Sequence, residues 1–429
     1  MAREEFTKYG FILAAIGSAV GLGNIWRFPY LVGKSGGGAF LIPYFIGVLL
    51  LGAPLLFFEL GVGKHYKTSV ISAFGKINPR LKHFGWIPII TAFLVLSYYL
   101  VIMGWTAMYS LFSLAGQYPQ FSEFTQTHAS LALFAIMLFF VTLVVVQGVK
   151  HGIEGVSKKL MPIFFVMLVA LFINSLFLPG FMDGIRFYLT PDFEQLKNID
   201  IWVLGFGQAL FSLSVGQGIM LTYGSYMKKK QGIVNASAWI IFADTIIAVM
   251  AGFIIFPIVF TFGLDPAAGP ELAFVTLPQI FISMNYGYLI GAAFFFLLFI
   301  GALTSAISIL EVPVAALIDE FKFKRRNAAL LVSGALLLCG LPSALSYSGY
   351  DITLFGQPFL DVLDHYVGSV LVLLSSLILA AYIHKHDLLD ILVREINYHS
   401  KHKLPFIIED IFHFIVPGII LMMLIFNLI

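Results

Sequence analysis

Long apolar runs separated by short polar segments dominate the sequence. A helix needs about 20 residues to cross a bilayer, and we count eleven runs of roughly that length or more. Backbone groups in lipid must be satisfied within the segment, so the pattern predicts an all-α integral membrane protein, a single polytopic domain over residues 1–429. The predicted spans are 10–33, 38–63, 84–115, 130–149, 160–180, 201–227, 236–263, 287–318, 328–347, 356–383 and 408–428.

Composition narrows the possible classes of protein. Hydrophobic residues make up 59% of the chain and charged residues 11%, against about a quarter charged in soluble domains, so a soluble protein is excluded. The net charge of +2 gives no basic excess to hold nucleic acid. Because Cys339 is the single cysteine, neither an intramolecular disulfide nor a zinc cluster built on thiolates can form.

The distribution of Lys and Arg predicts the orientation in the membrane. The N-terminal tail and the loops on its side of the membrane hold 21 of the 25 cations, whereas the opposite loops hold only Lys34, Arg186 and Lys197. The positive-inside rule therefore places the N-terminus in the cytoplasm. Eleven crossings then place Ile429 outside.

The middle of the first span predicts an interrupted helix. Gly17, Gly21 and Gly23 each cost a helix about 1 kcal/mol relative to alanine, and Asn24 is a polar group where lipid offers no partner. Unwound backbone at that depth is tolerated where it lines a cavity. The alternative is a face of small residues for close helix packing, since two of the glycines stand four apart.

The sixth span contains a matching interruption. Its centre, 214–218, repeats the valine and glycine positions of 19–23. Paired glycine-interrupted segments at the start of two five-helix halves indicate an inverted-repeat transporter with its site at the membrane midplane. Half-helix N-termini offer N–H groups to a carboxylate, and freed carbonyls attract a cation. One break therefore suits a zwitterion together with a sodium ion.

These motifs resemble the neurotransmitter:sodium symporter family. The run GSAVGLGNIWRFPY over 17–30, followed by GGGAFLIPY over 36–44, is similar to the first two helices of that family, and similarity continues at 97–99, 211–226, 303–305 and 360–368. The resemblance implies a LeuT-like 5+5 inverted-repeat fold, with repeats over about 8–180 and 200–384 and an eleventh helix over about 408–428. Many members have a twelfth helix, whereas eleven are expected here.

The resemblance implies two sodium sites built from oxygen donors. The first comprises the Ala19 carbonyl, Asn24, Ser212 and Asp244, completed by the substrate carboxylate, and the second comprises the carbonyls of Gly17, Val20 and Gly301 with the hydroxyls of Thr304 and Ser305. Oxygen donors suit a hard cation. For the two hydroxyls, the alternative is a hydrogen bond back to a carbonyl of their own helix.

A substrate pocket is implied by the same resemblance. Relatives that carry biogenic amines have aspartate where Gly21 stands, so glycine indicates an amino acid as substrate, whose carboxylate would accept from the Tyr99 hydroxyl. For Tyr98 and Tyr99 the alternative is an interfacial aromatic belt. The implied pocket comprises Ala19, Gly21, Leu22, Gly23, Val95, Tyr99, Phe211, Ser212, Ser214, Gln217, Ser305, Ser308 and Ile309.

Charges inside spans need partners, and the resemblance assigns them to gates. Arg27 and Asp364 correspond to an extracellular pair, with Asp361 as the rival partner. Arg3, Asp319 and Tyr226 correspond to a cytoplasmic gate. For Arg3 the alternative is an ordinary cation of the cytoplasmic side.

A chloride site is implied only in part. Chloride-dependent relatives hold the anion with four side chains, three of which correspond to Tyr44, Gln208 and Ser212, but the fourth position is Ala248. Asp244, one turn earlier, supplies a fixed negative charge. We therefore expect no chloride requirement; the alternative is that Asp244 lies at the cytoplasmic surface.

Together these observations predict a sodium-coupled symporter that imports a neutral amino acid by alternating access with one or two Na⁺, and no enzyme. Its expected partners are the amino acid and the lipid bilayer of a prokaryotic plasma membrane, with no nucleic acid, and the chain is expected to be a monomer or weak dimer. A non-transporting amino-acid sensor on the same fold is the alternative. A channel is disfavoured because the gate pairs indicate closure at both ends.

Overall fold

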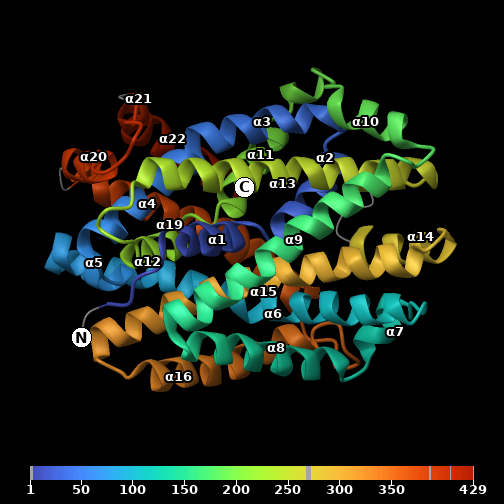
Figure 1. The fold of residues 1–429 in the computed structure, drawn as a ribbon, viewed down its shortest axis with the longest axis horizontal. Coiled ribbons are helices and arrows are strands. Elements are labelled where there is room, and N and C mark those ends of the chain that lie inside the picture. The colour runs from blue at the N-terminus through green and yellow to red at the C-terminus, as the bar shows by residue number, and fades with distance from the viewer. Residues whose placement is uncertain (1–2, 267–271, 386–387, 406, 429) are drawn as a thin grey trace.

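The computed structural model describes residues 3–266, 272–385, 388–405 and 407–428, and most of them lie in helices (Figure 1). In these residues eight helices are long and apolar enough to cross a membrane, and a ninth span is formed by a bent pair of helices. The long helices α6, α8, α9, α13 and α15 run along the longest axis of the molecule (Figure 1).

The first half of the chain supplies the first five spans, as the hydrophobic pattern predicts. Its helices are α1 (Lys8–Ala19), α2 (Phe28–Lys34), α3 (Leu41–Gly47), α4 (Ala53–Tyr66), α5 (Val70–Ile77), α6 (Trp86–Leu114), α7 (Phe121–Gln126), α8 (Ala129–Val146), α9 (Glu154–Ser175) and α10 (Phe181–Leu189). Short π-helical or 3₁₀ turns, η1 (Gly23–Arg27), η2 (Gly38–Phe40), η3 (Val48–Gly52), η4 (Pro79–Gly85) and η5 (Val149–Ile153), extend several of them.

The second half forms the remaining helices and one small hairpin. They are α11 (Ile199–Ser212), α12 (Ile219–Ser225), α13 (Ile233–Thr261), α14 (Leu277–Ser283), α15 (Gly287–Phe321), α16 (Arg325–Cys339), α17 (Leu341–Leu345), α18 (Phe359–His365), α19 (Val372–Lys385), α20 (Leu389–Asn397), α21 (Ile407–Asp410) and α22 (Val416–Leu428). The shorter turns are η6 (Gln195–Lys197), η7 (Leu272–Thr276), η8 (Tyr366–Leu371) and η9 (Ile411–Ile415).

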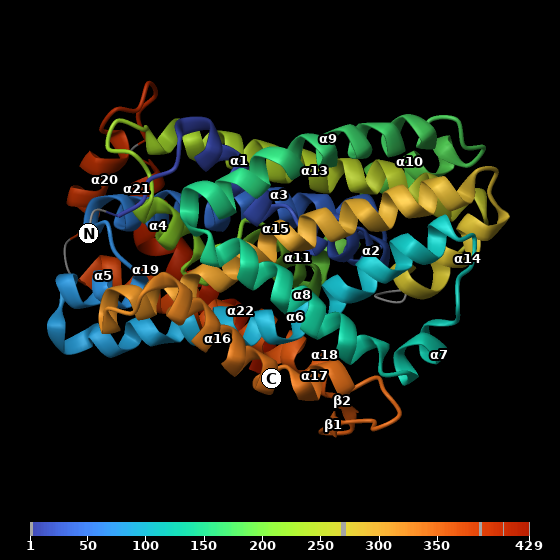
Figure 2. The same ribbon diagram turned by 60° about the horizontal axis from the view of Figure 1, so that its bottom comes forward.

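The hairpin lies between α17 and α18 at one edge of the molecule (Figure 2). Strand β1 (Thr353–Leu354) pairs antiparallel with β2 (Gln357–Pro358), with Leu354 opposite Gln357. The two-residue turn has positive φ at Phe355 and Gly356, the backbone that a tight hairpin with matching twist requires.

The predicted interruption of the first span is confirmed. Helix α1 starts at its N-cap Thr7, whose side chain accepts from the Gly10 N–H, and ends at Ala19, after which Val20 is extended (φ −81°, ψ 116°). The helix resumes after Leu22 at an angle of 45°. The glycines and Asn24 therefore mark a real break.

Two predicted spans differ from a continuous membrane helix. The sixth is divided into α11, of 14 residues, and α12, of 7 residues, because Ser214, Gly216 and Gly218 take positive φ values between them. The ninth, α16, has only 15 residues, since the helix ends at Cys339 before Gly340 and Pro342. Neither forms a continuous helix of 18 residues or more, whereas eight of the other predicted spans do.

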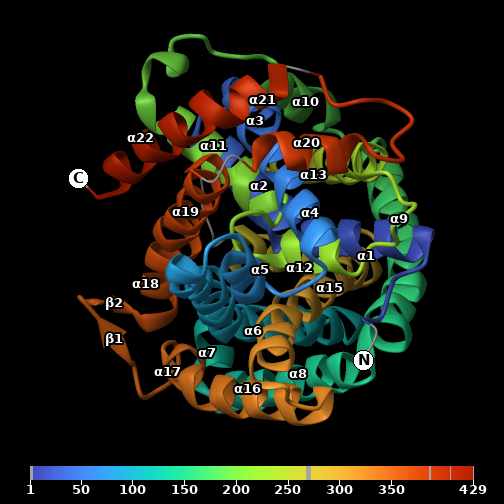
Figure 3. The same ribbon diagram turned by 90° about the vertical axis from the view of Figure 1, so that its left-hand side faces the viewer.

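The interrupted helices lie at the centre of the bundle. Viewed end-on, α2 and α12 are surrounded by other helices, with α8, α16 and α22 toward the outside (Figure 3). In agreement, 78% of the apolar 18-residue stretch is buried inside the protein in the spans of α6 and α15. The buried share is 39% in α8 and 33% in the span that includes α22. The unwound backbone is therefore enclosed by protein, where its polar groups find partners.

Candidate functional site

The two breaks meet face to face beside α15. Ser214, in the second break, donates to the Ser18 carbonyl at the first break (2.8 Å), and Ser305 of α15 donates to the same carbonyl (3.1 Å). Between them lies a small cavity of about 30 Å³, which we call the chamber. Its lining residues are Ser18, Ala19, Gly21, Gly23, Val95, Tyr99, Phe211, Ser212, Ser214, Gln217, Ile219, Ser305 and Ile309.

Eleven of the thirteen residues expected in the pocket line this cavity, whereas Leu22 and Ser308 do not. Ser308 is occupied elsewhere: its hydroxyl shares a hydrogen bond with the Ser18 hydroxyl (2.7 Å) and donates to the Ser305 carbonyl (2.7 Å). Ser18 and Ile219 line the cavity without having been expected. Ser18 is a polar residue next to the glycines of the first break, and its position in the sequence could have predicted that it lines the cavity.

Gly21 lies where there is no space for a side chain. A Cβ atom built there would lie 2.7 Å from the Ser305 hydroxyl and 2.9 Å from the Tyr99 hydroxyl. The Tyr99 hydroxyl therefore stands directly against the backbone of the first break, at the wall of the chamber.

Gln217 brings an unpaired polar group to the chamber. Its side chain is 3% exposed, lines the cavity, and has a carbonyl oxygen with no hydrogen-bond partner among the described residues. A buried acceptor without a donor costs about 1–3 kcal/mol, so a solute with a donor at this point would be favoured. Val95, Phe211 and Ile309 supply apolar walls around it.

The side chains expected at the first sodium site come together. The Asn24 amide donates to the Ser212 hydroxyl (2.9 Å) and to the Asp244 carboxylate (2.7 Å), and Ser212 donates to both carboxylate oxygens (2.8 Å each). All three are buried, so the alternative that Asp244 lies at the cytoplasmic surface is wrong. Ala19 lines the adjoining cavity, and a carboxylate, a hydroxyl and an amide form a donor set suited to Na⁺.

The groups expected at the second sodium site also converge. The Ser305 hydroxyl lies 3.4 Å from the carbonyls of both Gly17 and Val20. A Cβ atom on Gly17 would lie 3.2 Å from the Thr304 Cβ, and one on Gly301 would lie 3.5 Å from the Val20 carbonyl oxygen. Thr304 also bonds back to carbonyls of its own helix, the alternative noted above, and this leaves its oxygen lone pairs available.

Beside the first site lie the residues that correspond to a chloride site. Gln208 donates to the Gly23 carbonyl (2.8 Å), and its own carbonyl oxygen has no partner among the described residues. Tyr44 and Ala248 are fully buried. The carboxyl group of Asp244 lies next to Ser212 there.

Two carboxylates that are buried inside predicted spans were not assigned from the sequence. Glu59 of α4 accepts from the Gly216 N–H in the second break (2.5 Å), and Glu311 of α15 accepts from the Tyr226 hydroxyl (2.5 Å) and from Arg325 (2.8 Å). Both are fully buried. A glutamate inside an apolar span is itself the signal that would have found them.

The expected extracellular gate residues do not form an ion pair. No nitrogen of Arg27 lies within 4.0 Å of an Asp364 oxygen in the described part of the chain; its guanidinium instead stacks 5.0 Å above the Phe211 ring. The rival, Asp361, accepts from the Tyr347 hydroxyl (2.7 Å). A cavity of about 600 Å³ lies on this side, lined by Trp26, Asp361 and other residues.

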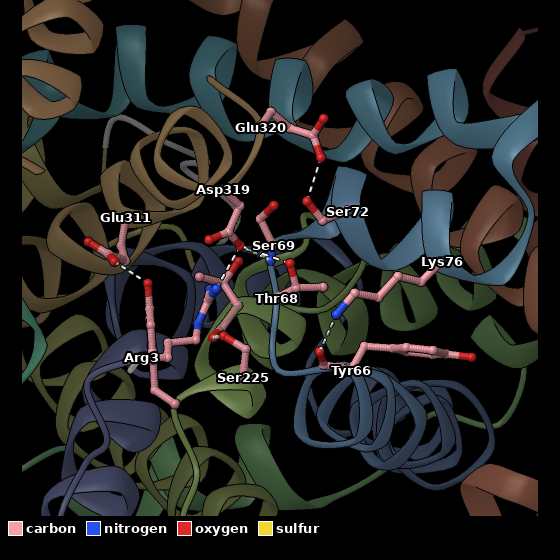
Figure 4. A network of polar contacts seen from close by, with 12 residues as sticks. Arg3, Tyr66, Thr68, Ser69, Ser72, Lys76, Ser225, Glu311, Asp319 and Glu320 are labelled. Carbon is pink, nitrogen blue, oxygen red and sulfur yellow. Dashed lines mark hydrogen bonds and ion pairs between the residues drawn. The ribbon is translucent and has the colours of Figure 1, made fainter. Parts of the chain in front are cut away.

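At the opposite end the expected gate residues are in contact (Figure 4). Arg3 pairs with Asp319 (2.6 Å), and its guanidinium lies 4.6 Å above the Tyr226 ring. The same Asp319 oxygen accepts from the Ser69 N–H (2.5 Å) and the Thr68 hydroxyl (3.0 Å). The N-terminal tail is thereby held against α15 and the start of α5.

Comparison with known proteins gives the family. A model of the sodium:neurotransmitter symporter family matches residues 3–130 and 120–429. The chain belongs to this family. The sodium-dependent transporter YhdH of Bacillus subtilis is 40% identical over 401 residues, covering 89% of this chain and 88% of that protein. A sodium-dependent transporter of Haemophilus influenzae is 34% identical over 401 residues, covering 88% of each.

The fold agrees with a solved member. The crystal structure of MhsT in complex with L-phenylalanine shares 37% identity with the chain, covers 99% of each, and superimposes with a TM-score of 0.91. The protein is therefore a LeuT-fold, multi-pass membrane protein of a sodium-dependent transporter family and no enzyme. The alternative of a non-transporting sensor finds no support in these relatives.

Proposed function

We propose that the protein is a sodium-coupled symporter that imports a neutral amino acid by alternating access. The observation that supports this proposal most strongly is the position of the first break, around 19–21. This unwound segment borders both clusters of oxygen donors and the solute chamber. A solute carboxylate at this junction would join the first cluster and face the Tyr99 hydroxyl, so that solute and sodium stabilise each other.

Sodium would act here as the coupled ion. At the first cluster, rotation of the Asn24 amide would turn its oxygen toward Ser212 and Asp244, where its nitrogen now donates. A potential of ~100 mV contributes about 2.3 kcal/mol per sodium and a tenfold gradient ~1.4. Two ions then give roughly 7.4 kcal/mol, enough for about 10⁵-fold accumulation at most.

The solute chamber suits a medium to large neutral amino acid whose side chain ends in a hydrogen-bond donor. The apolar walls would hold the body of that side chain, and the unpaired oxygen of Gln217 would accept from its end. Among the described residues that line the chamber, only Ser212 is hydrogen-bonded to an ionisable side chain, that of Asp244. This lining favours a substrate whose own side chain is neutral.

Transport is proposed to be independent of chloride. Asp244 places a carboxylate beside the first sodium cluster, and Ala248 supplies no hydroxyl to hold an anion. The fixed charge would replace the mobile one. When sodium leaves, Asp244 would take up a proton, and the return step would carry that proton outward.

We infer an orientation with the Arg3–Asp319 contact at the cytoplasmic side of a prokaryotic plasma membrane, in accord with the positive-inside rule. The C-terminus would then be outside the cell; Ile429 itself is not among the described residues. The described contacts close that side, while Arg27 and Asp364 stay apart on the other. Alternating access would exchange these two arrangements. The chain is proposed to act as a monomer or weak dimer.

Uptake into proteoliposomes with a panel of amino acids tests the proposal. An inward sodium gradient should drive accumulation of a neutral amino acid above equilibrium, and choline in place of sodium should remove it. Binding of an amino acid without accumulation would contradict the proposed symport and would instead favour the sensor.

A further inference from the structure

Three segments far apart in the sequence form one basic surface at the end that carries Arg3. The loop before α13 and the loop after α20 are joined, since the Val234 N–H donates to the Ser400 hydroxyl (3.4 Å), and they lie side by side in two views (Figures 2 and 3). Gln231 donates to the Lys8 carbonyl (3.4 Å), which adds the start of α1. We call this surface the basic patch; its exposed lysines are Lys8, Lys228, Lys229, Lys230, Lys401 and Lys403.

The second loop of the basic patch is held in shape. Ser400 also donates to the Ile396 carbonyl (2.7 Å), and the Leu404 N–H donates to the Asn397 side chain (2.6 Å), which closes the loop that carries two of the lysines. A Cβ atom on Gly232 would lie 2.7 Å from the His399 carbonyl oxygen, so the two loops pack backbone against backbone. The charges are therefore gathered by tertiary structure.

The lysines of the basic patch share the lack of an acidic partner. Among the described residues, none of the six forms an ion pair. Two cations nearby are paired, Lys64 with Glu395 (3.0 Å) and Lys67 with Glu5 (3.1 Å). The patch thus presents uncompensated positive charge.

Exposed aromatic residues place the basic patch at the level of lipid headgroups. Tyr9 is 76% exposed, Tyr398 is 59% exposed, and Trp239, near the start of α13, is 58% exposed. Tyrosine and tryptophan of membrane proteins concentrate at the interface between hydrocarbon and water. Lysines just beyond that interface meet the headgroups of the adjacent leaflet.

We propose that the basic patch binds the headgroups of anionic phospholipids and so fastens the two loops to the membrane surface. Clusters of four to eight cations next to a membrane helix recognise anionic lipid, and each lysine near the surface contributes about a fivefold increase in affinity. The inference rests on the chain being a membrane protein and is independent of which solute it carries.

Lipid retention by the full-length protein tests this proposal. The protein in detergent is titrated with phosphatidylglycerol or with phosphatidylcholine, and bound lipids are counted by native mass spectrometry. Phosphatidylglycerol should bind preferentially, and the Lys229→Gln/Lys401→Gln variant should bind it at least about tenfold more weakly. The matched control, Lys324→Gln/Arg326→Gln, removes the same charge from two other exposed cations at a different loop.

Each other outcome would overturn the proposal. Equal losses in the two variants would mean that overall charge, rather than the basic patch, holds the lipid. Equal binding of the two lipids would exclude recognition of anionic headgroups. Displacement of the bound lipid by inorganic phosphate or glycerol phosphate would identify a site for free anions. Sodium-driven uptake by each variant, measured separately, keeps a failure of this proposal distinct from a failure of the proposed transport.

Discussion

The side-chain amide of Asn24 donates to the carboxylate of Asp244 across 2.7 Å, although 220 positions separate the two residues in the chain. This contact joins the first break to α13 and is shared with Ser212 of α11. Three helices therefore contribute to one buried cluster beside the solute chamber, which makes the cluster the first target for mutation.

Disruption of either proposed sodium site should abolish coupled uptake. Asn24→Ala removes the amide and leaves Asp244 with one donor fewer, and Thr304→Val removes a hydroxyl from the second cluster. Both should eliminate sodium-driven uptake in proteoliposomes. Thr106→Val is the matched control, since Thr106 is buried and bonds only to the Met103 carbonyl of its own helix. Concentrative uptake by wild type in choline would contradict the prediction.

Asp244→Asn should lose activity in chloride-free buffer. The substitution keeps the shape of the side chain and removes the charge beside Ser212, so the first sodium cluster loses its only carboxylate from the chain. Wild-type uptake should be unchanged when gluconate replaces chloride and should rise when the vesicle interior is acidic. Normal uptake by the variant in chloride-free buffer would show that the fixed charge is dispensable.

Substitution of Gln217 should change the preferred substrate. Gln217→Leu removes the unpaired acceptor from the chamber, so amino acids with a side-chain donor should lose about tenfold in apparent affinity relative to apolar ones. Competition against the best wild-type substrate measures the ratio. Ser308→Ala should change this ratio less, because its hydroxyl already bonds to Ser18 and Ser305. Leucine as the tightest wild-type ligand, with polar and aromatic amino acids failing to compete, would count against the assignment.

Arg3→Gln should loosen the closed end. Asp319 would lose its ion pair while keeping the Ser69 and Thr68 hydrogen bonds, and the tail would lose its stacking on Tyr226. We expect about tenfold faster amide hydrogen exchange in the tail and around Thr68. Arg80→Gln, on an exposed turn, should leave exchange there unchanged. Identical exchange in all three proteins would remove Arg3 from the gate.

The α20 helix should detach from α4 in acid. The pKa of Glu395 is lowered from 4.5 to about 2, first by the hydrogen bond from His65 and then by Lys64, against burial, which raises it. A depressed carboxyl pKa contributes stability above the unfolded value, and this stability is lost as pH falls from about 4.5 toward 2. Glu395→Gln should lower the melting temperature at neutral pH and flatten its dependence on pH in that window.

The exposed carboxylate Asp390 on the same helix supplies the control for that measurement. Asp390→Asn should leave the difference in melting temperature between neutral and acidic buffer as it is in the wild type. A Glu395→Gln variant with the wild-type acid profile would show that this ion pair contributes nothing measurable, as many partly exposed pairs do.

The sequence by itself determined the membrane class, the spans and the two helix breaks. The length of an apolar run and its glycine content determine local structure, because the backbone N–H and C=O groups of a span must form hydrogen bonds within that span. The residues of both oxygen clusters were expected from the family resemblance rather than from the pattern of the chain alone. The breaks are where the glycines stand, after Ala19 and after Ser212.

Only the tertiary structure decided which side chains meet. Ser308 is bonded to Ser18, 290 positions away, and so leaves the pocket wall, and Asp361 is bonded to Tyr347 rather than to Arg27. Glu59 reaches the second break from another span. These pairings depend on how helices that are distant in sequence pack against one another. A helix break or a buried charge in the sequence indicates that a partner is needed, but the identity of that partner depends on the packing.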